Sequence, residues 1–292
     1  FTKEHFELVN GYSNEYWGVG YEDWDILLRC VVKGLPIRTE MENEITKTYG
    51  TFNGSTSYMK ILADNAKIRN VTNKDFTIST WFFAKDVPPY GESVDKNRCE
   101  YSIFSRPGYH TGLSYTHGGF LKCIIWTKTI GKSERHPVLI QVPLRAETWY
   151  HLGMVVDDKK QTLSLFINGT KIKTESYDGE LIPYLNKPYY IGAGDPDLSV
   201  WRNFFKGYIS EVGLWSEALS RHEIENIFNQ GITNVKGEYV TSTLPVGYWD
   251  FKGGYDDITF DNSGNSNHAK FHNVRFANIK FLKILQEVII LK

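Results

Sequence analysis

The sequence lacks the charge imbalance and the long apolar runs that indicate some classes of protein. Its 292 residues include 33 Lys and Arg against 34 Asp and Glu, for a formal net charge of −1. This balance gives no electrostatic reason to expect nucleic acid or an anionic membrane as a partner. No run approaches the roughly 18 apolar residues of a membrane-spanning helix. The chain begins at Phe1 without Met or a signal-peptide pattern, so we expect a piece of a longer protein.

Cysteine is scarce, and its spacing indicates no metal site. The three residues, Cys30, Cys99 and Cys123, are an odd number, which leaves at least one thiol unpaired. Cys30 lies in an apolar stretch of helical periodicity, so we expect it to be in a core. Cys99 and Cys123 either form a disulfide across a loop or remain free.

A glycosidase signature is absent as well. Glycosidases on β-sandwiches need two carboxylates at a set separation, for example in an E-x-D-x-x-E pattern on one strand. The stretch SEVGLWSE, residues 210–217, comes closest to this pattern. Because that stretch also has the pattern of a strand leading into a helix, we interpret Glu211 as structural.

The sequence does contain enough apolar and aromatic residues, 41% and 15% of the chain, for a packed core. The first part of the chain, residues 1–37, has helical spacing. Its segment EDWDILLRCVVKG places Ile26, Leu27, Cys30 and Val31 on one face of a predicted helix. Acidic residues crowd the first turn of this helix, where the helix dipole favours negative charge.

The rest of the chain has mainly alternating periodicity, which is typical of strands. Three consecutive strands are predicted, at 148–156, 161–167 and 170–175. Asn168-Gly169 suits the positive φ angles of a two-residue hairpin. A capping box at Ser220 and Glu223 predicts one later helix. We therefore expect residues 51–276 to be a mainly β, antiparallel sandwich with a single short surface helix.

Several of these segments resemble the laminin-G-like, concanavalin A-like jelly roll. The resembling pieces, in the family's order, are FNGSTSYMKI (52–61), FTISTWF (76–82), WYHLGMVVDDKKQTLSLFINGTKI (149–172), YYIGAGDP (189–196) and FKGYISEVGLWSEALSRHEIENIF (205–228). The resemblance implies a jelly-roll sandwich of a kind that binds glycans or protein ligands, frequently with calcium. Function does not follow from this fold by itself.

A last β-like segment, residues 247–276, resembles the stretch that usually opens such a unit, yet here it follows the helix. Either it folds back to complete the same sandwich or it starts a second unit. Unpaired strand edges promote aggregation, and the ends of a domain commonly lie close together, which favours folding back. We divide the chain into a segment at 1–48, a sandwich at 49–276 and a tail at 277–292.

Oxygen-rich turns are the candidates for calcium, which binds carboxylate and amide oxygens. The turn DNSGNSN offers Asp261, Asn265 and Asn267, and GDPD offers Asp195 and Asp197. The alternative is that these residues are there as turn formers. The candidates for an aromatic platform that stacks on a sugar are Trp126, Trp201 and Tyr109.

The stretch FELVNGYSNEYWGVGYEDWDILLRCVVKGLPI, residues 6–37, resembles the C-terminal, acceptor-side segment of GT-A glycosyltransferases of the β-1,4-galactosyltransferase type. In that family a W-G-x-G-x-E-D run leads directly into a helix that ends in Lys/Arg-Gly, and the preceding VNGY matches as well. By this resemblance Asp23 is the catalytic base, and Glu22 orients the acceptor. A carboxylate at a helix N-terminus keeps a low pKa, so the base is ionised and ready to accept a proton.

The neighbouring residues have roles that fit this resemblance. Gly18 and Gly20 let a loop approach the sugar donor and move as a lid, and Trp17 presents a ring face to a sugar. The family often has a third carboxylate directly after E-D. Here Trp24 takes that place, and Asp25 follows as a substrate-binding candidate.

The two resemblances together predict a glycan-binding domain attached to a transferase. The transferase would move a hexose, of the galactose or N-acetylhexosamine class, from a nucleotide sugar to a glycan or glycoconjugate acceptor. Mn²⁺ and the nucleotide sugar belong to the nucleotide-binding half, which residues 1–292 lack, so we expect these residues to be inactive alone. The alternative is a non-catalytic, lectin-like or adhesion module that binds carbohydrate or protein.

Overall fold

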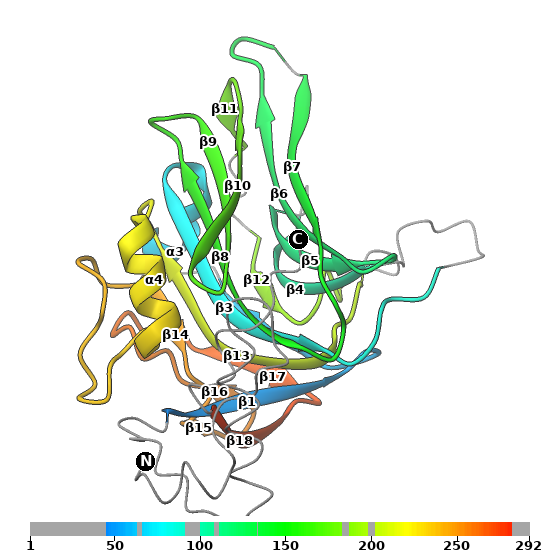
Figure 1. Ribbon diagram of the computed structural model, residues 1–292, viewed down its shortest axis with the longest axis vertical. Helices are drawn as coiled ribbons and strands as arrows, with labels where there is room; N and C mark the ends of the chain where they lie inside the picture. Colours follow the sequence, from blue (N-terminus) through cyan, green and yellow to red (C-terminus); the bar gives the residue numbers. More distant parts are fainter. Residues whose placement is uncertain are drawn as a thin grey trace, which may run out of the picture. The chain divides into compact units, whose positions relative to one another are not determined.

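The computed structural model describes residues 45–62, 66–90, 100–107, 111–132, 134–182, 187–197 and 202–281. They form a mainly β fold of two antiparallel sheets, the jelly-roll sandwich that the sequence predicts (Figure 1). The residues named above that lie outside the described ranges are Phe1, Trp17, Gly18, Gly20, Glu22, Asp23, Trp24, Asp25, Ile26, Leu27, Cys30, Val31, Cys99, Tyr109 and Trp201.

Sheet A has eight strands, in the order β10-β9-β8-β3-β13-β1-β18 with β14 paired to β13. Its strands are β1 (Ile45–Asn53), β3 (Phe76–Ala84), β8 (Trp149–Asp157), β9 (Thr162–Ile167), β10 (Thr170–Ser176), β13 (Lys206–Trp215), β14 (Gly247–Trp249) and β18 (Arg275–Phe281).

Sheet B has ten strands, in the order β11-β6-β5-β4-β12-β2-β17-β16-β15 with β7 paired to β6. Its strands are β2 (Tyr58–Ile61), β4 (Glu100–Arg106), β5 (Thr111–Thr116), β6 (Phe120–Lys128), β7 (Arg135–Pro143), β11 (Glu180–Leu181), β12 (Tyr189–Ile191), β15 (Gly254–Tyr255), β16 (Ile258–Thr259) and β17 (Ala269–His272).

The helical elements of the described residues are α3 (Ala66–Arg69), the 3-10 turn η1 (Val71–Asn73) and α4 (Arg221–Gln230). None of them has the length and apolar character needed to cross a membrane.

Strand β3, FTISTWFFA, shows how side chains divide between the two faces of sheet A. Phe76, Ile78 and Phe82 belong to the continuous apolar core between the sheets. Ser79 and Trp81 lie on the outer face and are nevertheless buried. The outer face is partly covered by helix α4, which lies against β8, β3 and β13 (Figure 1). The middle of sheet A is thus covered on both sides.

Helix α4 begins at the predicted capping box. The Ser220 hydroxyl accepts the backbone N–H of Glu223, and the Glu223 carboxylate accepts the backbone N–H of Ser220. These bonds satisfy donors of the first turn that have no partner within the helix. Ile224 and Ile227 face sheet A and join a second buried cluster with Trp215. The cap and the apolar face together fix the helix on the sheet.

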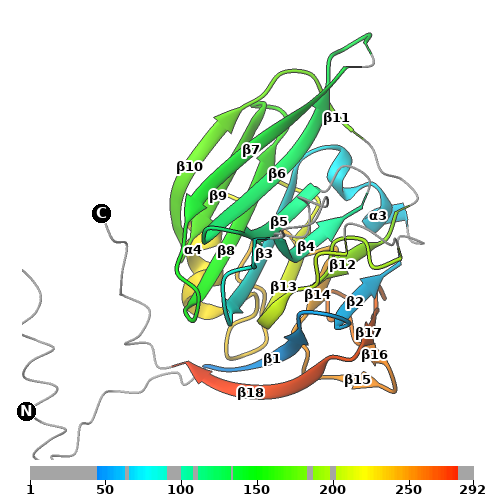
Figure 2. The same ribbon diagram turned by 90° about the vertical axis from the view of Figure 1, so that its right-hand side faces the viewer.

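Residues 247–276 lie in the same two sheets as the rest of the sandwich. Strand β14 pairs with β13, β17 with β2 and β18 with β1, all antiparallel. Of the two arrangements that the sequence leaves open, the structure has the folded-back one, with β18 alongside β1 (Figure 2). Strand β1 begins at Ile45 and β18 runs to Phe281, so paired strands extend beyond 49–276 at both ends.

Cys123 is a free thiol within the core. It lies on β6, is fully buried and belongs to the apolar cluster between the sheets. Removal from water disfavours the thiolate, so burial raises the pKa of Cys123. The sequence left open whether Cys123 is in a disulfide or free, and the structure shows the free thiol.

Candidate functional site

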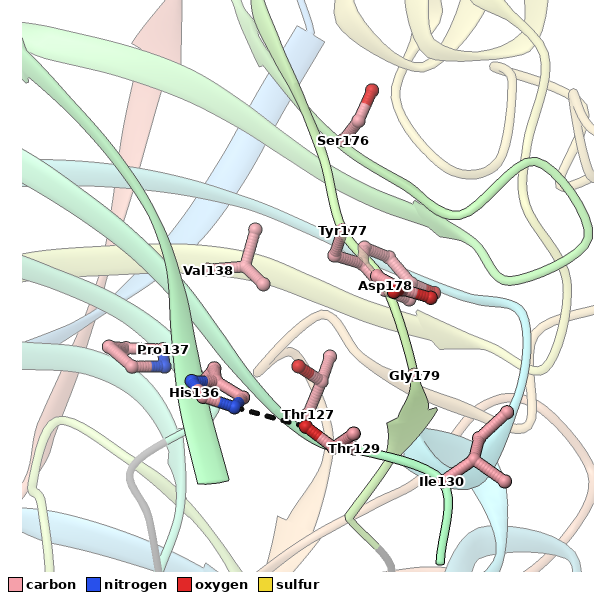
Figure 3. Close-up of a pocket in the computed structure, with 10 residues that line it drawn as sticks. All are labelled: Thr127, Thr129, Ile130, His136, Pro137, Val138, Ser176, Tyr177, Asp178 and Gly179. Atoms are coloured by element: carbon pink, nitrogen blue, oxygen red, sulfur yellow. Dashed lines mark hydrogen bonds between the residues drawn. The ribbon is translucent and has the colours of Figure 1, made fainter. Parts of the chain in front are cut away.

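A pocket opens at one end of the sandwich, between the β6–β7 hairpin and the segment that enters β11 (Figure 3). Its volume is about 420 Å³. Small-ligand sites in proteins commonly have volumes of about 300–1,000 Å³. The lining residues come from three segments: Thr127, Thr129 and Ile130 from β6 and the turn after it; His136, Pro137 and Val138 from β7; and Ser176, Tyr177, Asp178 and Gly179 from the end of β10 and the β10–β11 connection.

Gly179 brings the two walls of the pocket close together. Its φ angle is 99°, in a region that L side chains rarely adopt. A Cβ atom at this position would lie 2.3 Å from the backbone oxygen of Lys128. The next residue, Glu180, pairs with Lys128 in the short β11–β6 ladder. Glycine therefore permits the close backbone approach that shapes this side of the pocket.

The floor of the pocket is apolar and rigid. Val138 and the ring of Tyr177 are both buried. The Tyr177 hydroxyl donates to the Asp158 carboxylate at 2.9 Å. Burial, together with this hydrogen bond, raises the pKa of Tyr177 far above its ordinary value. Tyr177 therefore stays protonated, and its ring is a fixed wall rather than a proton donor for a reaction.

The rim of the pocket is exposed and carries polar groups beside the apolar Ile130 and Pro137. His136 Nε2 lies 3.2 Å from Thr129 Oγ1, and this contact orients the imidazole (dashed in Figure 3). Asp178 is exposed, and within the described part of the chain its carboxylate has no hydrogen-bond or ion-pair partner. An ionised carboxylate accepts hydrogen bonds only, and it has room for two donors side by side. The rim thus suits a ligand with several hydroxyl groups.

Among the described residues, the pocket does not bring together the two carboxylates of a glycosidase. Asp178 is the single carboxylate in the pocket, whereas glycoside hydrolysis uses two. Glu211, from the stretch closest to a glycosidase pattern, is buried and forms an ion pair with Lys47. It also accepts the backbone N–H of Ile232 at 3.0 Å. These contacts support the structural interpretation of Glu211.

The predicted calcium turn is a hydrogen-bonded turn in which Asp261 is the common acceptor. Its Oδ1 accepts the backbone N–H groups of Tyr248 and Ser263 at 2.8 and 2.9 Å. Its Oδ2 accepts the Ser263 hydroxyl and the backbone N–H of Asn267, both at 2.8 Å. Both carboxylate oxygens are therefore already bonded to hydrogen donors.

The two asparagines of the turn are also engaged. Asn267 Nδ2 donates to the carbonyl of Val246 at 2.7 Å, and Asn265 Oδ1 accepts Lys67 Nζ at 3.0 Å. Calcium requires oxygens that converge on the ion, so these residues, as they are placed, do not fit a calcium site. No group of three or more His, Cys, Asp or Glu among the described residues is arranged to hold a metal ion either.

In the GDPD turn, the Asp197 carboxylate already has a positively charged partner, Lys60. Asp195 is buried. The Asp197 carboxylate accepts Lys60 Nζ at 2.8 Å and the Tyr190 hydroxyl at 2.6 Å. The hydrogen bonds from Lys60 and Tyr190 lower the pKa of Asp197. Its charge is thus balanced within the protein.

Of the aromatic candidates, Trp126 lies in the described part of the chain, partly exposed on β6. It does not line the pocket, although the next residue, Thr127, does. The pocket residues were not among the predicted sites. The alternation of apolar residues along β6 and β7, which assigns Thr127 and Val138 to the inner face, is a signal that could have found them.

The comparisons with known proteins agree with the fold. The concanavalin A-like lectin/glucanases superfamily matches residues 53–225, more than half of the chain. The chain belongs to this superfamily. In this concanavalin A-like chain the match runs from the end of β1 into helix α4.

A second family, described as the N-terminal domain of galactosyltransferase, matches residues 1–52. This match supports the galactosyltransferase resemblance of the N-terminal stretch. It does not confirm the acceptor-side, C-terminal position inferred from the WGVGYED run. A search of curated proteins gave no significant match.

Solved structures that this chain is similar to include carbohydrate-binding and laminin G-like proteins. A "putative carbohydrate binding protein" from Bacteroides ovatus has 16% identity and a TM-score of 0.56 over 81% of this chain and 61% of its own. The Ruminococcus gnavus IT-sialidase CBM40 bound to α2,3-sialyllactose has 15% identity and a TM-score of 0.47, over 64% of this chain and 100% of its own. Mouse laminin α1 domains LG4-5 have 13% identity and a TM-score of 0.40, over 60% of this chain and 44% of their own. The chain thus spans less than two thirds of the Bacteroides protein.

Proposed function

We propose that the sandwich is a carbohydrate-binding domain and that the pocket between the β6–β7 hairpin and β11 receives the sugar. The observation that carries this proposal is one cavity of about 420 Å³ with an apolar floor and polar groups on its rim. Sugars offer both kinds of surface, because their hydroxyls surround rings with apolar C–H faces. The Bacteroides ovatus protein with the same fold, which is described as carbohydrate binding, supports the proposal.

Each group of the pocket has a role in this proposal. The Asp178 carboxylate accepts two neighbouring hydroxyls, and hydrogen bonds to an ionised group are the stronger ones. The His136 imidazole, held by Thr129, bonds a further hydroxyl. Val138 and the Tyr177 ring contact the C–H face of the sugar. Because the pocket is open at the end of the sandwich, it suits the terminal residues of a glycan.

The test is a glycan array followed by calorimetric titration of the strongest binder. Asp178→Asn keeps the size of the side chain and removes its charge. We expect it to weaken binding by about tenfold, since a hydrogen bond to a charged group contributes about 1.5–3 kcal/mol. His136→Ala should weaken binding through the loss of a hydroxyl partner.

The matched control is Asp256→Asn, at an exposed loop residue between β15 and β16. Its φ angle of 51° is one that asparagine tolerates. This variant should bind like the wild type. Equal binding by the Asp178 and Asp256 variants, or no binding to any glycan on the array, would refute the pocket as the sugar site.

For the whole protein we propose hexose transfer from a nucleotide sugar to a glycan, with the sandwich holding the acceptor or its carrier. The support is the WGVGYED run and the galactosyltransferase family match at residues 1–52. In this proposal Asp23 removes the proton of the acceptor hydroxyl, Glu22 orients the acceptor, and Trp17, Gly18, Gly20 and Asp25 line the substrate. Mn²⁺ and the nucleotide sugar are required by the transferase and not by the sandwich.

The test is transfer of galactose or N-acetylhexosamine from nucleotide sugars by the whole protein. Asp23→Asn should lower kcat by at least about a hundredfold, the contribution of a positioned base. Asp256→Asn, an exposed residue of the sandwich outside residues 1–52, serves as the control. A whole protein that binds glycans and transfers none would favour the alternative, a non-catalytic lectin-like module.

A further inference from the structure

A row of aromatic side chains crosses the outer face of sheet A beyond the part that helix α4 covers. Tyr208 of β13 is paired in register with Phe83 of β3, and Phe83 with Trp149 of β8. Tyr49 of β1 joins the row diagonally. All four side chains are partly exposed. Their strands are neighbours in the sheet, in the order β8-β3-β13-β1 (Figure 1).

The rings of this row pack on one another. The ring centroids of Tyr49 and Tyr208 are 4.8 Å apart, those of Phe83 and Tyr208 5.3 Å, and those of Phe83 and Trp149 5.7 Å. An antiparallel sheet face that meets water usually carries polar residues. The Tyr49 and Trp149 rings, from the two outer strands of the four, are themselves 6.2 Å apart, so the four rings form one compact aromatic cluster on this face.

Two cations flank the row. Lys85 Nζ lies 5.0 Å from the centroid of the Tyr208 ring. Arg275 of β18 is paired with Thr51, which is paired with Tyr208, so the arginine continues the same line across the sheet. Among the described residues no carboxylate forms an ion pair with either cation. This local positive charge stands in a chain whose formal net charge is −1.

We propose that this row, together with the flanking Lys85 and Arg275, binds an acidic oligosaccharide whose sugar rings carry carboxylates. The sugar rings stack on Tyr208 and Phe83. The carboxylates bind Arg275, which offers a planar pair of donors, and Lys85. This site is distinct from the pocket. Trp149 of the row lies at the start of strand β8, and Asp158, which binds the Tyr177 hydroxyl of the pocket, follows the end of the same strand. Nine strand residues extend about 27 Å, so the two sites lie at opposite ends of β8.

The charges favour this ligand over a second copy of the chain. In a two-fold symmetric dimer the same surface faces itself, so Arg275 and Lys85 of the two copies would lie close to their like-charged counterparts. Like charges brought together and removed from water are unfavourable. An acidic sugar chain supplies both the missing negative charge and the flat rings.

The experiment measures binding of polygalacturonate and polysialic acid, each beside its carboxyl-reduced, uncharged form. We expect at least one acidic polymer to bind at least about tenfold more tightly than its reduced form, and more weakly as salt rises. Arg275→Gln and Lys85→Gln should each lower the affinity about fivefold, the effect of losing one partly exposed ion pair. Tyr208→Ala should lower it further, because it removes the stacking surface.

Three controls keep the outcome decisive. Lys236→Gln removes an exposed positive charge on a distant loop and should leave binding unchanged. Asp256→Asn removes an exposed negative charge outside the pocket and should also leave it unchanged. Thermal unfolding of Tyr208→Ala checks that the variant is folded, and Tyr208→Leu replaces it if it is not. Equal affinity for acidic and reduced polymers, or no loss in the Arg275 and Lys85 variants, overturns the proposal. The proposal is also overturned if the Arg275 and Lys85 variants change their oligomeric state and still bind the polymer as the wild type does.

Discussion

His151 is a fully buried imidazole whose titration should control the acid stability of the sandwich. It lies on β8 beneath helix α4, with its ring 5.8 Å from that of Phe228. Its Nε2 is 2.8 Å from Ser79 Oγ, and its Nδ1 has no hydrogen-bond partner in the described part of the chain. Burial lowers the pKa of His151 to about 3, and the nearby positive charge of Lys47 acts in the same direction.

The sign of the effect follows from the two pKa values. The folded-state pKa of about 3 lies below the unfolded value of about 6.5, so the unfolded chain takes up the proton first as the pH falls. The stability that His151 contributes is complete above pH 6.5 and declines between about pH 6.5 and 3. From pH 7.5 to 5.0 the loss is about 2 kcal/mol, or about 4–8 °C in Tm for a domain of this size.

The assay is urea unfolding at pH 7.5, 6.5, 5.5 and 5.0 for the wild type and His151→Gln. Glutamine does not titrate and can still bond the Ser79 hydroxyl. The variant should lose most of the wild type's dependence on pH in this range, whatever its stability at pH 7.5. His222→Gln, at an exposed position on α4, should keep the wild-type dependence.

The carboxylate of Glu223 does not titrate between pH 7.5 and 5.0. Burial alone would raise the pKa of Glu223, but hydrogen bonds from Ser242 and Ser220 hold it at about 2. Its contribution to stability is therefore lost only as the pH falls below about 4.5. A wild type whose free energy of unfolding is constant from pH 7.5 to 5.0, or a His151→Gln variant with the full slope, would refute the reasoning.

Three further predictions concern the cap, the pocket wall and the Asp261 turn. Ser220→Ala removes the helix cap and should lower the free energy of unfolding by about 1 kcal/mol, while Ser220→Asn should restore most of it in the same denaturant assay. Gly179→Ala should cost more than Gly131→Ala, since both have positive φ but only the first would place a Cβ against backbone. It should also weaken glycan binding. Asp261→Ala removes the acceptor of the turn and should lower Tm by several degrees, about 2 kcal/mol of stability. Adding calcium or a chelator should leave the wild-type Tm unchanged, because the turn is held by its own donors; a calcium-dependent rise would support a metal site there.

Local features of the fold were predictable because their causes are local. The capping box of α4 needs only Ser220 and Glu223, three residues apart, and both bonds are present. The hairpin between β9 and β10 needs positive φ at two positions, and Asn168 and Gly169 have φ angles of 49° and 75°. The alternation of β8 and β9 gave those strands to within one residue of their ends.

The candidate sites depend on strand order, which the sequence pattern does not contain. The pocket exists because β11 pairs with β6, which brings Asp178 opposite His136 from about forty residues away. The aromatic row exists because β13 lies between β3 and β1, which places Tyr208 beside Phe83. In the single sequence these aromatic residues look like core residues, and nothing local distinguishes them.

The turn at Asp261 shows a different limit. Asp, Asn, Ser and Gly are the residues that a calcium loop and a tight turn both use. The sequence therefore leaves the two interpretations open. The difference lies in whether the carboxylate faces outward or accepts bonds from its own chain, and here Asp261 accepts them from Tyr248, Ser263 and Asn267.

The most direct test of the central claim, that the sandwich binds sugar in its end pocket, is a crystal structure with the strongest glycan from the array. We predict a sugar ring over Val138 and Tyr177, with neighbouring hydroxyls on the Asp178 carboxylate and another on His136. A glycan bound elsewhere on the sandwich, with the pocket left to solvent, would contradict it.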